Sequence, residues 1–240
     1  MCNCIDEFGN YSGTYEGKTY EDGIMNNDLF SSEKIKILWI LRETHRNFNV
    51  KNWWGRKEYL IKNLNPFDSE KEKGSKIYTW KPVARISYQI LNGYESNDDY
   101  ELAASLEHIA IINLKKTPGG KKVNKEYYAY LKDENNRKIF IEQIKKINPD
   151  VIICGNTLNQ IKTSEINFRG DTEKIKQELS KHSTNEKYMK KNSYFCYSNK
   201  VFINPYHPSY VMDRDEYVKI VVKAYQNWQE IKKDCLIFEW

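Results

Sequence analysis

VFINPYHPSYVMDR, residues 201–214, opens with three apolar residues of the β-branched and aromatic kind that favour a buried strand. An Asn-Pro pair then ends the run, because proline has no N–H to donate to a sheet. His207 and Ser209 follow at once, at the carboxyl end of the predicted strand. Open α/β sheets bind their ligands at that edge. His207 is therefore a candidate for chemistry, and a loop histidine that merely caps the following helix is the alternative.

Three more apolar runs of strand length precede this stretch: IKILWIL at 35–41, IAIINL at 109–114 and VIIC at 151–154. Helical patterns lie between and after them, at 135–147 and in a clear amphipathic stripe at 215–232. Strands that alternate with helices favour a parallel sheet covered on both faces. The sequence therefore predicts an α/β fold, of three layers (α/β/α), with a central four-stranded parallel sheet.

The whole chain, 1–240, is predicted to be one domain, because no Pro/Gly/Ser-rich linker and no internal repeat divides it. Residues 1–34 are polar, glycine-dotted and without periodicity, so we expect an irregular N-terminal arm there. The hydrophobic content of 40% is too high for a disordered chain and sufficient for a single core.

Composition also limits the partners and cofactors. No apolar run reaches about 18 residues and no signal-peptide pattern is present, so we expect a cytoplasmic protein without a membrane partner. The five cysteines form no C-x-x-C pair, which argues against a zinc or iron–sulfur site, and no cofactor is expected. The net charge of +5 is small, so the position of the basic residues matters more than their number.

The clearest basic segment lies between Lys115 and Lys125, where five lysines and no acidic residue flank the turn TPGG. A basic loop that contains glycine can follow a phosphate backbone closely. Lysine clusters are more often simply solvated surface, so both interpretations stay open.

Polar groups also follow two other predicted strands, at the junctions where the apolar runs end. Asn113 interrupts its apolar run near the carboxyl end, and a buried asparagine has up to four hydrogen bonds to satisfy. Facing a cleft, its carboxamide reads the paired donor and acceptor of a planar amide or base edge; bonding to the loop backbone is the alternative. Gly155 and Asn156 follow the run at 151–154, where a glycine turn lets backbone N–H groups approach an anion.

Taken in order, these junctions resemble those of the uracil-DNA glycosylase superfamily over about 35–232. The stretch HPSYV at 207–211 is similar to the last motif of one branch, HPS followed by apolar residues. Asn113 corresponds to the strand-end residue that reads the flipped base. PDVIICGNT at 149–157 resembles the strand and glycine turn that press on a DNA phosphate, and Glu43 falls where the first motif begins.

The chain also departs from the family pattern. The first motif of the family usually carries Gly and Pro with an Asp or Asn that positions water, whereas this chain reads RETHR at 42–46. The cysteine ligands of the iron–sulfur branch are missing as well. The resemblance therefore leaves open whether uracil or another modified base is the target.

The resemblance implies a DNA glycosylase-like hydrolase of DNA repair that flips a base from single- or double-stranded DNA and cleaves its N-glycosidic bond. His207 would donate a hydrogen bond to the departing base, and Glu43 or His45 would orient the attacking water. Asn113 would select the base, which would stack on Phe48, Trp53 or Trp54.

Residues with an implied role at the DNA backbone are Arg42, Arg46, Lys115, Lys116, Gly155, Asn156 and Ser209, with Val211 as an apolar wedge in the base stack. A non-catalytic nucleic-acid or nucleotide-binding module on the same fold is the second interpretation. A structural α/β domain, in which His207 and Asn113 satisfy their own loops, is the third.

Overall fold

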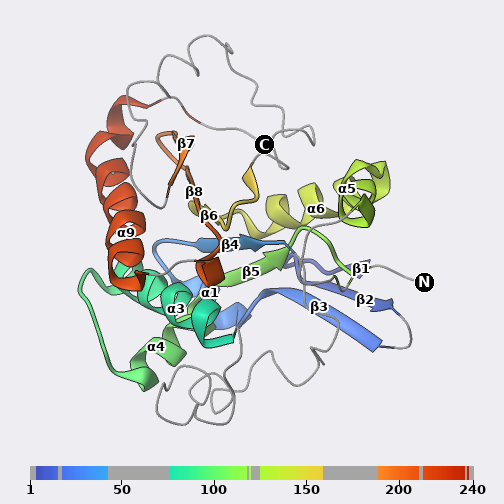
Figure 1. Cartoon of the computed structure of the whole chain (residues 1–240), viewed down its shortest axis with the longest axis horizontal. Helices are drawn as coiled ribbons and strands as arrows, with labels where there is room; N and C mark the ends of the chain where they lie inside the picture. The colour runs from blue at the N-terminus through green and yellow to red at the C-terminus, as the bar shows by residue number, and fades with distance from the viewer. Residues whose placement is uncertain are drawn as a thin grey trace.

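A computed structural model describes residues 4–15, 18–42, 76–117, 119, 125–158, 189–210, 213–235 and 237. Eight strands form one mixed sheet in the order β1-β2-β3-β5-β4-β6-β8-β7 within these ranges (Figure 1). The strands are Cys4–Ile5 (β1), Tyr11–Tyr15 (β2), Lys18–Ile24 (β3), Ile37–Leu41 (β4), Ala110–Asn113 (β5), Val151–Cys154 (β6), Met189–Cys196 (β7) and Val201–Pro205 (β8).

The middle of the sheet consists of the four apolar runs seen in the sequence. Strands β5, β4, β6 and β8 are neighbours and pair in parallel, with Leu41 opposite Asn113 and Ile153 opposite Ile203. Every residue of the four strands is buried, as expected for strands covered on both faces. The predicted α/β class is confirmed. The sheet as a whole is mixed, because β3 and β7 join it antiparallel to β5 and β8.

Helices cover both faces of the sheet, and alternate residues of β4 pack against the helices of one face or the other. Trp39 packs with the helices α3, α4 and α9, whereas Leu38 and Ile40 pack with α6 and with Phe30 of α1. The helix α5 lies beside α6 (Figure 1). The helices are Asn27–Ser32 (α1), Lys76–Asn92 (α3), Asp99–Ser105 (α4), Lys125–Lys132 (α5), Glu134–Ile147 (α6) and Arg214–Ile231 (α9), with single 3-10 turns at Leu106–His108, Pro208–Tyr210 and Lys232–Asp234.

The expectation of an irregular arm over residues 1–34 is wrong. This region contains the strands β1, β2 and β3 and the helix α1, whose first turn is capped by the Asn26 side chain. The strands alternate in burial: Tyr20 and Asp22 are buried while Glu21 between them is exposed. Because the buried positions carry tyrosine and aspartate in place of aliphatic residues, the period of two is hidden from a hydrophobicity pattern.

Candidate functional site at the carboxyl edge of the sheet

The candidate site lies where the four parallel strands end. Backbone hydrogen bonds extend the ladder beyond the strands: Lys115 N–H donates to the Arg42 carbonyl at 2.9 Å and Gly155 N–H to the Ile40 carbonyl at 3.0 Å. The Asn156 N–H likewise donates to the Pro205 carbonyl at 2.8 Å. The polar residues that follow β4, β5, β6 and β8 are therefore held along one edge of the sheet, as the sequence predicts.

The two ends of this edge carry Asn113 and His207. Neighbouring strands lie about 5 Å apart, so roughly 15 Å of edge separates the backbones of these residues, with the ends of β4 and β6 between them. This distance fits the length of an extended small ligand and is too long for both side chains to contact the same ligand atom. Asn113 and His207 can therefore serve one ligand only if they touch different parts of it.

The His207 imidazole has a defined tautomer. Its Nδ1 accepts the backbone N–H of Ser209 at 3.3 Å and lies 2.8 Å from the Ser209 hydroxyl oxygen. A backbone N–H can only donate, so Nδ1 is the unprotonated nitrogen and Nε2 carries the proton. The Tyr217 hydroxyl of α9 also donates to the neighbouring Tyr206 carbonyl at 2.8 Å, which fixes the loop on the helix. His207 therefore presents an N–H donor from a restrained loop.

His207 is uncharged at neutral pH. Desolvation of the half-buried ring and, as the smaller cause, the positive charge of Arg42 at the end of β4 together lower the pKa of its imidazole from 6.5 to about 4. The pKa shift favours the neutral imidazole, and the hydrogen bond from the Ser209 N–H to Nδ1 favours the tautomer with the proton on Nε2. Ser209 contacts the histidine, and the role at the DNA backbone that the resemblance implies for it stays a prediction.

Gly155 lets the end of β6 approach the histidine. A Cβ atom at this position would lie 3.2 Å from Leu41 Cδ2 and 3.6 Å from both His207 Cδ2 and the Ile40 carbonyl oxygen. A larger side chain would occupy the space beside the imidazole ring. Asn156, next in sequence, takes a left-handed conformation with φ of 60°. The glycine turn predicted after this strand is present, and it borders the histidine.

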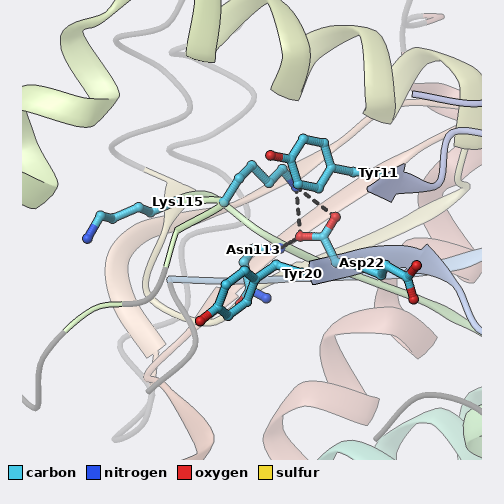
Figure 2. A pocket seen from close by; sticks show the side chains of 7 residues that line it. Tyr11, Tyr20, Asp22, Asn113 and Lys115 are labelled. Carbon is cyan, nitrogen blue, oxygen red and sulfur yellow. Dashed lines mark hydrogen bonds and ion pairs between the residues drawn. The ribbon is translucent and has the colours of Figure 1, made fainter. Parts of the chain in front are cut away.

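Asn113 is almost completely buried, with 8% of its surface exposed. Its backbone N–H donates to Asp22 Oδ2 at 2.8 Å. None of the residues that the structure describes hydrogen-bonds to the Asn113 carboxamide. The carboxamide lines a small cavity of about 10 Å³, room for one water molecule, together with Tyr20, Asp22 and Lys115 (Figure 2). A buried carboxamide without a partner is available to a ligand.

The expectation that Lys116 contacts a phosphate is wrong. Only 2% of its side chain is exposed, and its ammonium lies 2.9 Å and 2.8 Å from the two carboxylate oxygens of Asp22 (Figure 2). It also donates to Gln143 Oε1 at 2.5 Å. Burial lowers the pKa of Lys116, and the Asp22 carboxylate opposes that shift. The neighbouring Lys115 is also buried, with its ammonium directed away from Asp22 (Figure 2).

Sequence reasoning missed Asp22, Tyr20 and Gln143 as neighbours of the site. Asp22 and Tyr20 belong to β3, which was expected to be irregular, and Gln143 lies on α6. For Gln143, the sequence held one signal of a buried polar role, because this glutamine lies on the apolar face of α6. In the structure Gln143 is fully buried, beside the buried residues Phe140 and Ile144.

Several predicted site residues lie outside the described ranges. They are Glu43, His45, Arg46, Phe48, Trp53, Trp54 and Val211. Their roles in water activation, base stacking, phosphate contact and wedge insertion stay predictions. Arg42 is described, is partly exposed, and acts electrostatically on His207.

In the ranges given above, no cluster of three or more His, Cys, Asp or Glu side chains is arranged to hold a metal ion. Over the same part of the chain, no helix combines the length and the apolar character needed to cross a membrane.

A scan against known protein families produced no match, and no curated protein sequence matched the chain. A function for this chain is therefore inferred from the geometry of the site and from the motif resemblance.

Proposed function

We propose that this chain is a DNA glycosylase-like hydrolase that cleaves the N-glycosidic bond of a flipped uracil or modified base. The single observation that carries the proposal is the state of His207: a neutral imidazole, with Nδ1 occupied by the Ser209 N–H and Nε2 protonated, beyond the carboxyl end of β8. The finer three-layer, glycosylase-like architecture is part of the same proposal.

Such a donor can stabilise the departing base when the N-glycosidic bond is cleaved. When the bond between the sugar and the base breaks, the electron pair leaves with the base, and water adds to the sugar carbon. Negative charge grows on the base oxygen, and a preorganised N–H close to that oxygen stabilises it. A neutral imidazole does this without releasing a proton, so the low pKa of His207 suits a hydrogen-bond donor better than a general acid.

Asn113 supplies the second function, recognition. A carboxamide offers one acceptor and two donors, which match the alternating groups on the Watson–Crick edge of a base. Its burial and the lack of any partner within the described part of the chain support a role toward a ligand. With His207 at the other end of the edge, the base would be held at Asn113 and at His207 on different atoms.

A second function has one specific observation in its favour. The described residues that directly follow the four parallel strands, 42, 114–117, 155–158 and 206–210, include no Asp or Glu, and the Asp22 carboxylate of β3 is buried against Lys116. Water activation would then depend on Glu43 or His45, which are outside the described ranges. A non-catalytic nucleic-acid or nucleotide-binding module is the alternative that this observation favours.

The experiment uses a panel of single-stranded and duplex oligonucleotides, each with one uracil, hypoxanthine or oxidised pyrimidine. Excision leaves an abasic site that breaks in alkali, and the free base is detected by mass spectrometry. The proposal expects such a product from at least one substrate. Salt-sensitive binding without an abasic product from any substrate would favour the binding module.

A further inference from the structure

The strand β3 ends its pairing with β5 at Ile111, two residues before Asn113. Gly23 pairs with Ile111 and Ile24 with Ala110, and no further β3–β5 pair lies beyond Gly23 in the described ladder. Gly23 has φ of 142°, and a Cβ there would lie only 2.8 Å from the Asn10 Cα, so only glycine fits this close approach. The backbone N–H of Asn113 is therefore left without a partner from the β3 backbone.

The Asp22 side chain accepts the hydrogen bond from the Asn113 N–H that the β3 backbone does not accept. Asp22 Oδ2 accepts the Asn113 N–H at 2.8 Å (Figure 2). On the other side of β5, the next amide, that of Leu114, donates to the Leu41 carbonyl of β4 at 2.9 Å. The last residue of β5 is therefore held from both sides, by a carboxylate on one and by a parallel strand on the other.

The carboxylate is itself fixed by a closed polar network. Lys116 Nζ contacts both Asp22 oxygens, and Gln143 Nε2 donates to Asp22 Oδ1 at 2.8 Å. Lys116 also lies 5.2 Å from the centre of the Tyr11 ring of β2. Each oxygen of Asp22 thus accepts two hydrogen bonds, and a buried network in which every group is satisfied is rigid. The Asn113 carboxamide takes no part in it.

We propose that Asp22 is a positioning residue for Asn113: its carboxylate, balanced by Lys116, fixes the end of β5 so that the Asn113 carboxamide meets the edge of a base. This inference rests on the proposed function. It assigns the N-terminal strands a part in base discrimination, although they carry none of the motif residues.

A matched pair of double variants separates positioning from stability. In Asp22→Asn/Lys116→Met, the asparagine keeps an oxygen that accepts the Asn113 N–H. Its NH2 group can donate to Gln143 Oε1, which loses its Lys116 donor, once the Gln143 carboxamide turns by half a rotation. Asp22→Leu/Lys116→Met removes the same charges and also the acceptor. Replacing a buried ion pair with uncharged residues of similar volume is often tolerated, so both variants are expected to fold, which thermal unfolding checks.

Two readouts are measured on each variant. The first is hydrogen exchange of the Asn113 amide by NMR. The second is the ratio of affinities for an oligonucleotide with the preferred base of the panel and for the same oligonucleotide with its unmodified counterpart. We expect the asparagine variant to keep amide protection and the wild-type ratio within about twofold. The leucine variant is expected to lose protection and to lower the ratio about tenfold or more, because small displacements of a recognition group are costly.

A folded leucine variant with an unchanged ratio would overturn the proposal. If that variant does not fold, Asp22→Glu tests the proposal, because it keeps the ion pair but moves the acceptor oxygen by one methylene group. A wild-type affinity ratio in Asp22→Glu would also overturn the proposal. If the wild-type protein binds one base preferentially but does not excise it, the proposed hydrolysis is refuted. The affinity ratios of the variants would then still test the positioning role of Asp22. Wild-type protein without any base preference would refute both.

Discussion

At the scale of single residues, the protonation state of His207 determines what the site can do. An imidazolium would be repelled by Arg42 and would cost energy to bury, and these two effects keep the ring neutral. A neutral ring whose Nδ1 is occupied can offer a hydrogen bond only through Nε2. This restriction makes the residue a donor of fixed direction, and it can be tested directly.

The titration of His207 is the first prediction. Two-dimensional NMR of the imidazole nitrogens should show a pKa of about 4 and, above it, the proton on Nε2. Arg42→Gln should raise this pKa, because a positive charge near the ring is removed. An ordinary pKa near 6.5 in the wild-type protein would contradict the assignment.

The same pKa predicts how stability depends on pH. The folded-state pKa lies below the unfolded-state value, so the unfolded chain binds the proton first. The contribution of His207 to stability is complete above about pH 6.5 and is lost as the pH falls toward 4. His207→Asn should therefore lose less stability than the wild type between pH 7 and pH 4.5, measured by urea unfolding. Identical losses in both proteins would contradict the shifted pKa.

Ser209 gives the third prediction. Ser209→Ala removes the hydroxyl that lies 2.8 Å from Nδ1 but keeps the backbone N–H. A net hydrogen bond is worth about 1 kcal/mol, so we expect the rate of base excision to fall about fivefold. Unchanged excision together with unchanged nitrogen shifts of His207 would show that the hydroxyl has no positioning role.

At the scale of elements, the close approach of the β6 turn to the β8 loop depends on Gly155. Gly155→Ala introduces a Cβ 3.2 Å from Leu41 Cδ2, which requires a shift of a few tenths of an ångström. Gly155→Val adds two methyl groups beside the His207 ring. We expect the alanine variant to lose excision activity by roughly tenfold and the valine variant by more, while melting temperatures show that both remain folded. Full activity of the valine variant would show that the contact has no role.

The elements also show how far sequence reasoning extends. The four parallel strands could be predicted because runs such as ILWIL are apolar on both faces, and the junction residues followed from the strand ends. Strands β2 and β3 could not, because their buried positions carry tyrosine and aspartate. The burial of Lys116 could not be predicted either, since its partner Asp22 lies 94 residues earlier in the chain and only the β3–β5 pairing brings them together.

At the scale of the whole molecule, the Asp22–Lys116 pair joins the N-terminal strands to the rest of the sheet. Lys116→Ala leaves a buried carboxylate without a counter-charge, and such a loss costs about 3–5 kcal/mol. Lys138→Ala is the control, because both side chains of the Lys138–Glu134 pair on α6 are exposed and the pair is expected to contribute little to stability. Urea unfolding should separate the two variants clearly. Equal free energies of unfolding would contradict the structural role of the buried pair.

The central claim is that His207 stabilises a departing base, and the most direct measurement is the single-turnover rate of base release for wild type and His207→Ala. The substrate is the oligonucleotide that the wild-type protein cleaves best, at pH 7.5 and with enzyme in excess. We expect a rate lower by about 10²–10³ in the variant, the usual effect of removing one preorganised donor. Equal rates, or no base released by the wild type from any substrate, would contradict the claim.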